Sequence, residues 1–359
     1  MSARVAAVLV VLLLALGGGA LLLQQQGHLQ RPAGAAALGH PLLKNFKAAD
    51  VAAISLREPG GALTLERKAL EWTIAERAGF PADLDKVRDL VLKALELKVG
   101  QSEPIGDKDR ARLKLDDSGT QLEFRGADGK PMARLTIGAR FFKREPENPA
   151  RATGDGRYVM LPDDATMVFV VADPLTLASA KSADWISRSG FAAEKVKAME
   201  VVLASGERWR IERPGDNAAW KLSPIRAGEK IDVMRANSAS YSLNSVDLAD
   251  VAASGAGAQA ADTGLDKPFA TLVAATFDGL TYTVKLGKPA GDNFHAAVAI
   301  AGEAKASGPD AAERGSKLAE RLAREKALAG HTLLIGKSKF EDILKKRAEL
   351  LEKKDAGRK

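Results

Sequence analysis

The chain has 359 residues, and 46% of them are hydrophobic, which is enough to build two cores of ordinary size. It contains no cysteine, so disulfides, thiolate metal ligands and a cysteine nucleophile are excluded. The formal net charge of +7 is concentrated near the end, where residues 313–359 carry 14 Lys or Arg against 8 Asp or Glu. The remainder is close to neutral, which argues against a folded basic face that binds nucleic acid.

Residues 1–23 predict a short cytoplasmic tip and a transmembrane anchor. The uncharged run over residues 5–23 is rich in Val, Leu and Ala and includes Val5, Leu9, Leu12, Leu16 and Leu23. At about 1.5 Å per residue such a helix spans about 28 Å, close to the thickness of the bilayer core. A cleaved signal peptide is the alternative, but no small-x-small site follows the run directly, so an uncleaved anchor is favoured. Arg4 weakly favours a cytoplasmic N-terminus, with the bulk of the chain outside the bacterial inner membrane.

An internal repeat follows a flexible spacer at residues 24–40. Residues 51–101 and 196–252 share one plan, in which two strands and a turn precede a third strand that carries Trp72 or Trp220. The pair Glu66-Arg67 recurs as Glu212-Arg213. A repeat of this length indicates duplicated domains, predicted at residues 41–190 and 191–351 with a basic tail at 352–359.

In the first repeat, strands are predicted at 54–56, 63–67 and 72–74, followed by a helix that starts near Pro81. The apolar face of this helix is predicted to contain Leu84, Val87, Val91, Ala94 and Leu95. A hairpin of 111–115 with 121–124 comes next, then a strand at 133–138 that ends at Gly138. A loop at 146–156 precedes two closing strands at 158–161 and 167–171.

In the second repeat, strands are predicted at 201–203, 209–213 and 220–222, then a helix whose inner face holds Ile231, Met234, Ser238 and Tyr241. A hairpin joins 270–277 to 280–286, and Gly287 ends its second strand. Strands at 294–300 and 331–335 flank a charged helical insertion at 309–328. A final helix is predicted from Ser338, with Phe340, Ile343, Leu344 and Leu351 on its apolar side. The predicted fold class is α+β, with an N-terminal transmembrane helix and two tandem domains, each an antiparallel β-sheet packed with a helix.

Several short motifs carry a family resemblance. They are the run Gly264, Leu265, Asp266, Lys267, Pro268, the glycines Gly138 and Gly287, the Trp72 and Trp220 strands, Pro81 and the closing segment 337–351. With them the chain resembles the bacterial family called domain of unknown function 4340, over roughly residues 41–351. In the first repeat, Pro104-Ile105-Gly106-Asp107 is interpreted as the weaker counterpart of the run that starts at Gly264. The resemblance implies a single-pass membrane protein with an extracytoplasmic domain. It also implies an accessory role beside gliding-type ABC transporters and offers no catalytic residues.

The sequence offers little for catalysis or metal binding. The four histidines have no i, i+4 pair of the kind that holds a metal on a helix, and Asp163-Asp164 is interpreted as a turn. No phosphate loop or hydrolase nucleophile elbow is present. We therefore expect no enzyme activity, cofactor or metal. Trp72 and Trp220 are interpreted as core residues, with a ligand-stacking platform as the alternative.

These observations favour a membrane-anchored extracytoplasmic accessory or scaffold protein of a cell-envelope assembly, with the bilayer and a membrane protein as partners and no nucleic acid. Lys345, Lys346 and Arg347 are predicted to form a contact surface on the final helix. A periplasmic glycan- or lipid-binding module, with its site between the two copies, is the alternative. An unrecognised hydrolase is a third reading, which requires polar residues to converge in space.

Overall fold

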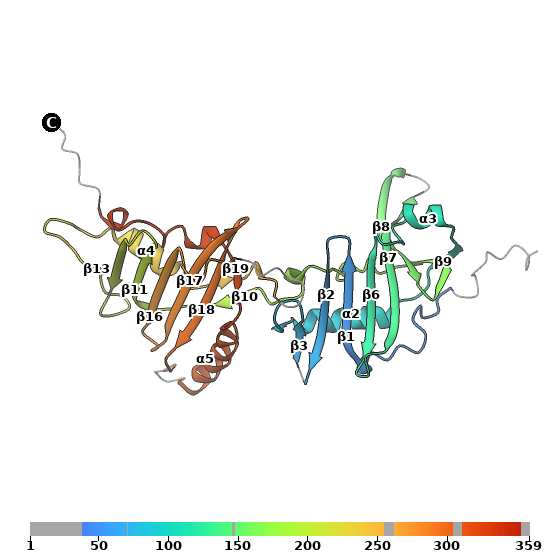
Figure 1. Ribbon diagram of the computed structural model, residues 1–359, viewed down its shortest axis with the longest axis horizontal. Helices are drawn as coiled ribbons and strands as arrows, with labels where there is room; N and C mark the ends of the chain where they lie inside the picture. Colours follow the sequence, from blue (N-terminus) through green and yellow to red (C-terminus); the bar gives the residue numbers. More distant parts are fainter. Residues whose placement is uncertain (1–37, 70, 146–147, 255–261, 304–310, 353–359) are drawn as a thin grey trace, which may run out of the picture. The chain divides into compact units, whose positions relative to one another are not determined.

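The computed structural model describes residues 38–352 except 70, 146–147, 255–261 and 304–310 (Figure 1). Two compact units are formed, one by the described part of Met1–Ala62 with Arg88–Ala180, the other by Leu63–Val87 with the described part of Lys181–Lys359. Two large antiparallel sheets dominate the chain, and helices are few, so the α+β class is confirmed. The domain boundary near residue 190 stays a prediction.

The first sheet has nine strands in the order β4-β3-β2-β1-β6-β7-β8-β9-β5. Its strands are β1 Val51–Glu58, β2 Gly61–Lys68, β3 Glu71–Ile74, β4 Phe80–Pro81, β5 Gln101–Pro104, β6 Thr120–Gly126, β7 Pro131–Glu145, β8 Asn148–Leu161 and β9 Asp164–Val171. Alternate side chains of β6 are buried, as the period-two pattern of a half-buried strand requires.

The second sheet has eight strands in the order β13-β12-β11-β16-β17-β18-β19-β15. Its strands are β11 Val196–Leu203, β12 Arg208–Glu212, β13 Lys221–Ser223, β15 Asp250–Val251, β16 Ala270–Thr276, β17 Thr281–Ala290, β18 Asn293–Ala301 and β19 Leu333–Gly336. A separate pair consists of β10 Ser189–Phe191 and β14 Val246–Asp247.

The two sheets have the same topology. When β11 is aligned with β1, each of the eight strands of the second sheet has a counterpart at the same place in the first, and only β4 is extra. Even a local irregularity recurs, because the pairing register shifts between Ile137 and Arg140 in β7 and between Leu286 and Pro289 in β17. We call the residues of β1–β9 the first repeat and those of β11–β19 the second repeat.

One helix follows the third-strand region of each repeat, although the predicted inner faces differ from the observed ones. In α2, Leu84–Glu96, the buried stripe centres on Leu90, whereas Leu84 and Leu95 are exposed. In α4, Val233–Tyr241, the buried residues are Ala236, Ala239 and Ser240. Met234 is 76% exposed, so the predicted face of α4 is wrong. The helix instead turns small side chains inward and packs against β11.

Three predicted elements of the chain differ from the structure. Residues 107–112 form a helix, α3 Asp107–Arg112, in place of the strand predicted at 111–115. Ion pairs of Arg110 with Asp107 and of Arg112 with Asp109 join residues three apart, a spacing that supports a helical turn. The loop predicted at 146–156 is largely strand, because β8 begins at Asn148 and pairs with β7.

The predicted final helix is replaced by two short 3-10 helices, Lys337–Phe340 and Arg347–Leu350. Phe340, Ile343 and Leu350 are nevertheless fully buried. Residues of β12 and the turn before it bind the backbone just before the second short helix and at its first residue. The indole nitrogen of Trp209 donates to the carbonyl oxygen of Lys345 at 2.9 Å, and the Arg347 amide donates to Glu207 at 3.0 Å. These bonds take the place of the hydrogen bonds that a continuous helix would form.

The charged insertion is confirmed as α5, Ala311–Lys326, which packs against β18. The predicted membrane anchor and most of the spacer lie among residues 1–37, outside the described residues, as does the tail from 353. Within the parts of the chain that the structure describes, no helix is long and apolar enough to span a membrane.

Candidate functional site

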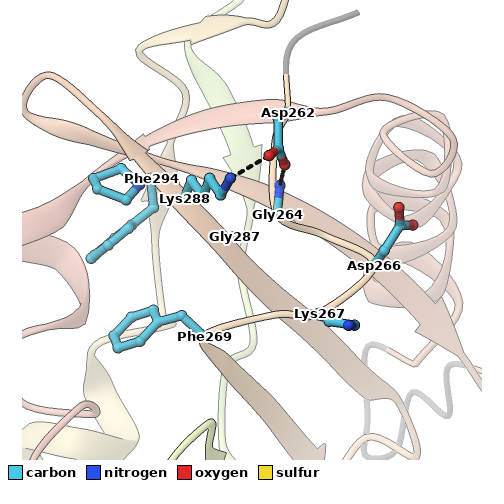
Figure 2. Close-up of a pocket in the computed structure, with 9 residues that line it drawn as sticks. Asp262, Gly264, Asp266, Lys267, Phe269, Gly287, Lys288 and Phe294 are labelled. Atoms are coloured by element: carbon cyan, nitrogen blue, oxygen red, sulfur yellow. Dashed lines mark hydrogen bonds and ion pairs between the residues drawn. The ribbon is translucent and has the colours of Figure 1, made fainter.

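The motif that starts at Gly264 forms a loop that lies against the end of β17 (Figure 2). The amide of Lys288 donates to the carbonyl oxygen of Thr263 at 2.7 Å, and the amide of Phe269 donates to that of Leu286 at 2.8 Å. The side chain of Lys288 forms an ion pair with Asp262, which also accepts a bond from the Gly264 amide at 3.2 Å. We call residues 262–269 the signature loop.

Two glycines allow the signature loop and β17 to approach each other. Gly264 has a φ of +68°, which L side chains rarely adopt, and a Cβ there would lie 2.8 Å from Cγ of Lys288. A Cβ on Gly287 would lie 2.0 Å from the carbonyl oxygen of Thr263. Backbone geometry therefore explains why glycine occupies these two positions.

The signature loop and β17 enclose an open pocket of about 650 Å³, which we call the signature-loop pocket. Its lining residues are Asp262, Gly264, Asp266, Lys267, Phe269, Gly287, Lys288, Pro289 and Phe294. Phe269 and Phe294 stack with their ring centroids 5.4 Å apart, and they lie on the left in Figure 2, whereas Asp266 and Lys267 lie on the right. Phe269 is 40% exposed, and Nζ of Lys337 lies 5.8 Å from the centroid of Phe294. The pocket thus offers an exposed aromatic surface beside both charge signs.

Two charged groups of the pocket, Asp262 and Lys288, stabilise each other in their ionised forms. The hydrogen bond and the charge of Lys288 hold the pKa of Asp262 below its usual value. Nδ1 of His295 lies 2.9 Å from the carbonyl oxygen of Lys288, so this histidine supports the strand end beside the pocket. A carboxylate that is ionised and already paired suits recognition of a partner better than proton transfer.

The first repeat contains the same backbone arrangement with different side chains. The amide of Ala139 donates to the carbonyl oxygen of Leu113 at 2.7 Å, and a Cβ on Gly138 would lie 2.3 Å from that oxygen. Lys114 takes the place of Gly264 with a φ of +55°. The counterpart of the signature loop is therefore the segment from Lys114, so the assignment to Pro104-Ile105-Gly106-Asp107 is wrong. Pro104 instead ends β5.

The aromatic pair belongs to the second repeat alone. Counting five residues from Lys114 places Gly119 at the position of Phe269. Phe294 is paired with Pro289, and the equivalent pair in the first repeat joins Arg157 to Arg140. The two repeats therefore share the contact between the glycine and the loop, and the stacked pair of Phe269 with Phe294 has no equivalent at the same two positions of the first repeat.

A second cluster lies beneath α5 and was not predicted from the sequence. The carboxylate of Glu325 is 3% exposed and accepts hydrogen bonds from the Tyr282 hydroxyl and the Ala192 amide, each at 2.9 Å. Arg321 approaches it at 3.5 Å and pairs with Glu194 at 2.8 Å. Burial raises the pKa of Glu325 and that of the Tyr282 hydroxyl. The cluster connects α5 to the sheet. Because the Glu325 carboxylate is buried, a molecule from solvent cannot reach it.

The other predicted residues are placed as follows. Trp72 and Trp220 are buried, and the Trp220 indole donates to Asn237 at 2.8 Å while Arg213 lies 4.5 Å over its ring, an arrangement that suits a core role. Pro81 lies in β4. In the described ranges, no group of three or more His, Asp or Glu could hold a metal ion.

The three residues of the predicted basic contact surface, Lys345, Lys346 and Arg347, have different environments in the structure. The guanidinium of Arg347 forms an ion pair with Glu229 and donates to the carbonyl oxygen of Pro224, so it is engaged within the fold. Lys345 pairs with Asp342, and Lys346 is exposed. The motif that starts at Gly264 pointed to the signature-loop pocket in the sequence. Phe294 lies in a different strand, so its spacing from the motif did not associate it with the pocket.

Comparison with known proteins identifies a family. A model of the family described as Domain of unknown function (DUF4340) matches residues 72–268, which is more than half of the chain. The matched region extends from Trp72 to Pro268, the last residue of the motif that starts at Gly264. Neither the curated proteins nor the solved structures yield a match.

Proposed function

The chain belongs to the DUF4340 family, and we propose that it is a membrane-anchored, extracytoplasmic binding protein that recruits a protein partner through the signature-loop pocket. In this role it is an accessory or scaffold subunit of a cell-envelope assembly, such as an ABC transporter in the inner membrane. It is not an enzyme and requires no cofactor.

One observation carries this proposal. Both repeats place a loop against the same strand end, but only the second adds the stacked pair of an exposed Phe269 and a half-buried Phe294 there. The stacked rings are not needed for this contact, because the first repeat forms it with Gly119 and Arg157 at the two positions. Aromatic residues flanked by charged groups are typical centres of protein interfaces.

The apolar run over residues 5–23 supports the proposed location. Its length fits the bilayer core, and the following spacer would let the repeats reach a partner in the same membrane. A C-terminal fusion to a reporter enzyme that is active only outside the cytoplasm tests the orientation. High reporter activity is expected, and activity only of a cytoplasmic reporter would contradict it.

The interface is tested by photo-crosslinking in cells. A photoreactive phenylalanine replaces Phe269, and in a matched control it replaces Tyr241, an exposed aromatic residue on α4 in the same repeat. We expect a discrete protein adduct from position 269 in the membrane fraction and none from position 241. The partner is then identified by mass spectrometry and co-purified with the chain.

A substitution decides whether the adduct reflects binding. Phe269→Asp places a charge in the aromatic surface and should reduce co-purification of the identified partner at least tenfold, while Tyr241→Asp should leave it unchanged. Equal recovery with Phe269→Asp and with the unaltered protein would exclude this pocket as the interface. The thermal unfolding midpoint of both variants checks that each remains folded.

A further inference from the structure

The first repeat contains a larger hollow that the proposed interface does not use. Its volume is about 860 Å³, within the range of small-molecule sites. The segment 40–46 forms one wall, and α2, Val99 and the strands β5, β8 and β9 supply the rest. Most of its surface is apolar and comes from residues such as Leu42, Phe46, Val99, Met167 and Phe169. We call it the first-repeat hollow.

A buried hydroxyl without a partner lines this hollow. Ser102 is 7% exposed, and its Oγ has no hydrogen-bond partner in the described part of the protein. It lies opposite Phe169 in the pairing of β5 with β9, so both side chains stand on the same face of the sheet. An unpaired hydroxyl is costly to bury, and an acceptor on a ligand would satisfy it.

The second repeat shows that the fold does not require this hydroxyl. Val251 pairs with Leu333 at the place where Ser102 pairs with Phe169, and both Val251 and Leu333 are buried apolar residues. The fold therefore accepts a valine at this position. The serine is an addition that belongs to the first repeat.

The polar residues of the hollow carry both charge signs. Lys44 and His40 come from the segment before β1, and Asp164 begins β9. Asp164 accepts a hydrogen bond from Thr166, and Lys44 forms no ion pair within the described ranges. A ligand head group with one anionic and one cationic end would complement Lys44 and Asp164.

The position of the hollow along the chain points to the membrane as the source of the ligand. His40 follows the apolar run of residues 5–23 by only 17 residues in the sequence. If residues 5–23 are anchored as in the proposed function, the hollow lies within reach of the lipid surface. Its volume suits one acyl chain rather than two.

We propose that the first-repeat hollow binds a zwitterionic phospholipid with a single acyl chain. The chain occupies the apolar part beside Met167 and Phe169, and the Ser102 hydroxyl donates to the ester carbonyl oxygen. The phosphate faces Lys44 and His40, while the ammonium group faces Asp164. The inference rests on the proposed anchoring, and it adds a ligand site distinct from the signature-loop pocket.

The test uses the full-length protein purified into an amphipathic polymer that contains no lipid. The probe is lysophosphatidylethanolamine with a photoreactive diazirine in its acyl chain, and labelled residues are mapped by mass spectrometry. We expect labelling within 40–46 and 161–169. Excess unlabelled lysophosphatidylethanolamine should suppress it, whereas a free fatty acid or the head group alone should compete at least tenfold less effectively.

Two variants make the result specific. Ser102→Val copies the second repeat and should weaken binding roughly fivefold through loss of one hydrogen bond. Met167→Trp fills the hollow and should abolish labelling, and its control is Leu92→Trp on the exposed side of α2. Labelling that is scattered over the chain, unaffected by Ser102→Val, or equally suppressed by fatty acid would overturn the proposal. Because no membrane is present, such a failure leaves the crosslinking test at Phe269 unaffected.

Discussion

Gly287 lies against the carbonyl oxygen of Thr263 so closely that a Cβ on the glycine would stand 2.0 Å from that oxygen. The same relationship joins Gly138 to Leu113 in the first repeat, where the distance would be 2.3 Å. In both places the next amide donates to the oxygen at 2.7 Å. The duplicated unit is thus defined by a backbone contact that only glycine permits.

Replacing this glycine should be severely destabilising. Gly287→Ala forces the loop and β17 apart, and we expect a loss of about 2–4 kcal/mol in the free energy of unfolding. Gly60→Ala in the β1–β2 turn is the control, because a Cβ there meets nothing within 4 Å. Urea unfolding of both variants measures the difference. Similar stabilities would show that the loop can move away at little cost.

The Glu325 cluster should make stability depend on pH. Burial raises the pKa of Glu325 in the folded state, so the folded protein holds its proton more tightly than the unfolded chain. Its contribution is complete below the ordinary value of 4.5 and is lost as the pH rises through the folded pKa. Tyr282, Arg321 and Glu194 are the ionisable groups that face it.

Glu325→Gln removes this titration. Relative to the unaltered protein, the variant should gain stability as the pH rises above about 4.5, as measured by denaturant unfolding between pH 4 and 8. Tyr282→Phe should cost about 1–3 kcal/mol, because it removes a partner of a buried oxygen. Parallel pH profiles for the Gln variant and the unaltered protein would contradict the assignment.

The ion pair of Arg347 with Glu229 should respond to pH in the opposite direction. The hydrogen bond from Arg347 lowers the pKa of Glu229 to about 2, so its stabilisation is present above 4.5 and is lost as the pH falls toward 2. Arg347→Met should lower the unfolding midpoint at pH 7, and the deficit should shrink on acidification. Lys317→Met, which breaks an exposed pair with Glu313, is the control and should change little. A deficit that is constant with pH would refute the mechanism.

The tryptophans should behave as core residues. Trp220→Ala removes a buried ring, its hydrogen bond to Asn237 and its contact with Arg213, and we expect a cost of about 3–5 kcal/mol. Met234→Ala on the exposed side of α4 should change stability by less than about 0.5 kcal/mol. Thermal or urea unfolding compares them. A stable Trp220→Ala variant would revive the ligand-stacking alternative.

Much of the fold was accessible from local patterns. The strands around Trp72 and Trp220, the hairpin at Asp278-Gly279 and the charged helix α5 follow from alternation, turn chemistry and helical periodicity. Predictions failed where tertiary contacts compete with local preference. The segment after Phe340 looks helical, yet Trp209 and Glu207 take its backbone groups.

The duplication, the α+β class and the two glycines Gly264 and Gly287 could be read from the amino-acid sequence, because they depend on periodicity and on backbone conformations that few residues can adopt. The contacts between distant residues required the three-dimensional structure. Phe294 joins Phe269, Glu325 joins Tyr282, and Ser102 stands buried without a partner, since strand register sets such neighbours across long stretches of chain. The counterpart of Gly264 was likewise identified only by a shared hydrogen bond and a shared positive φ.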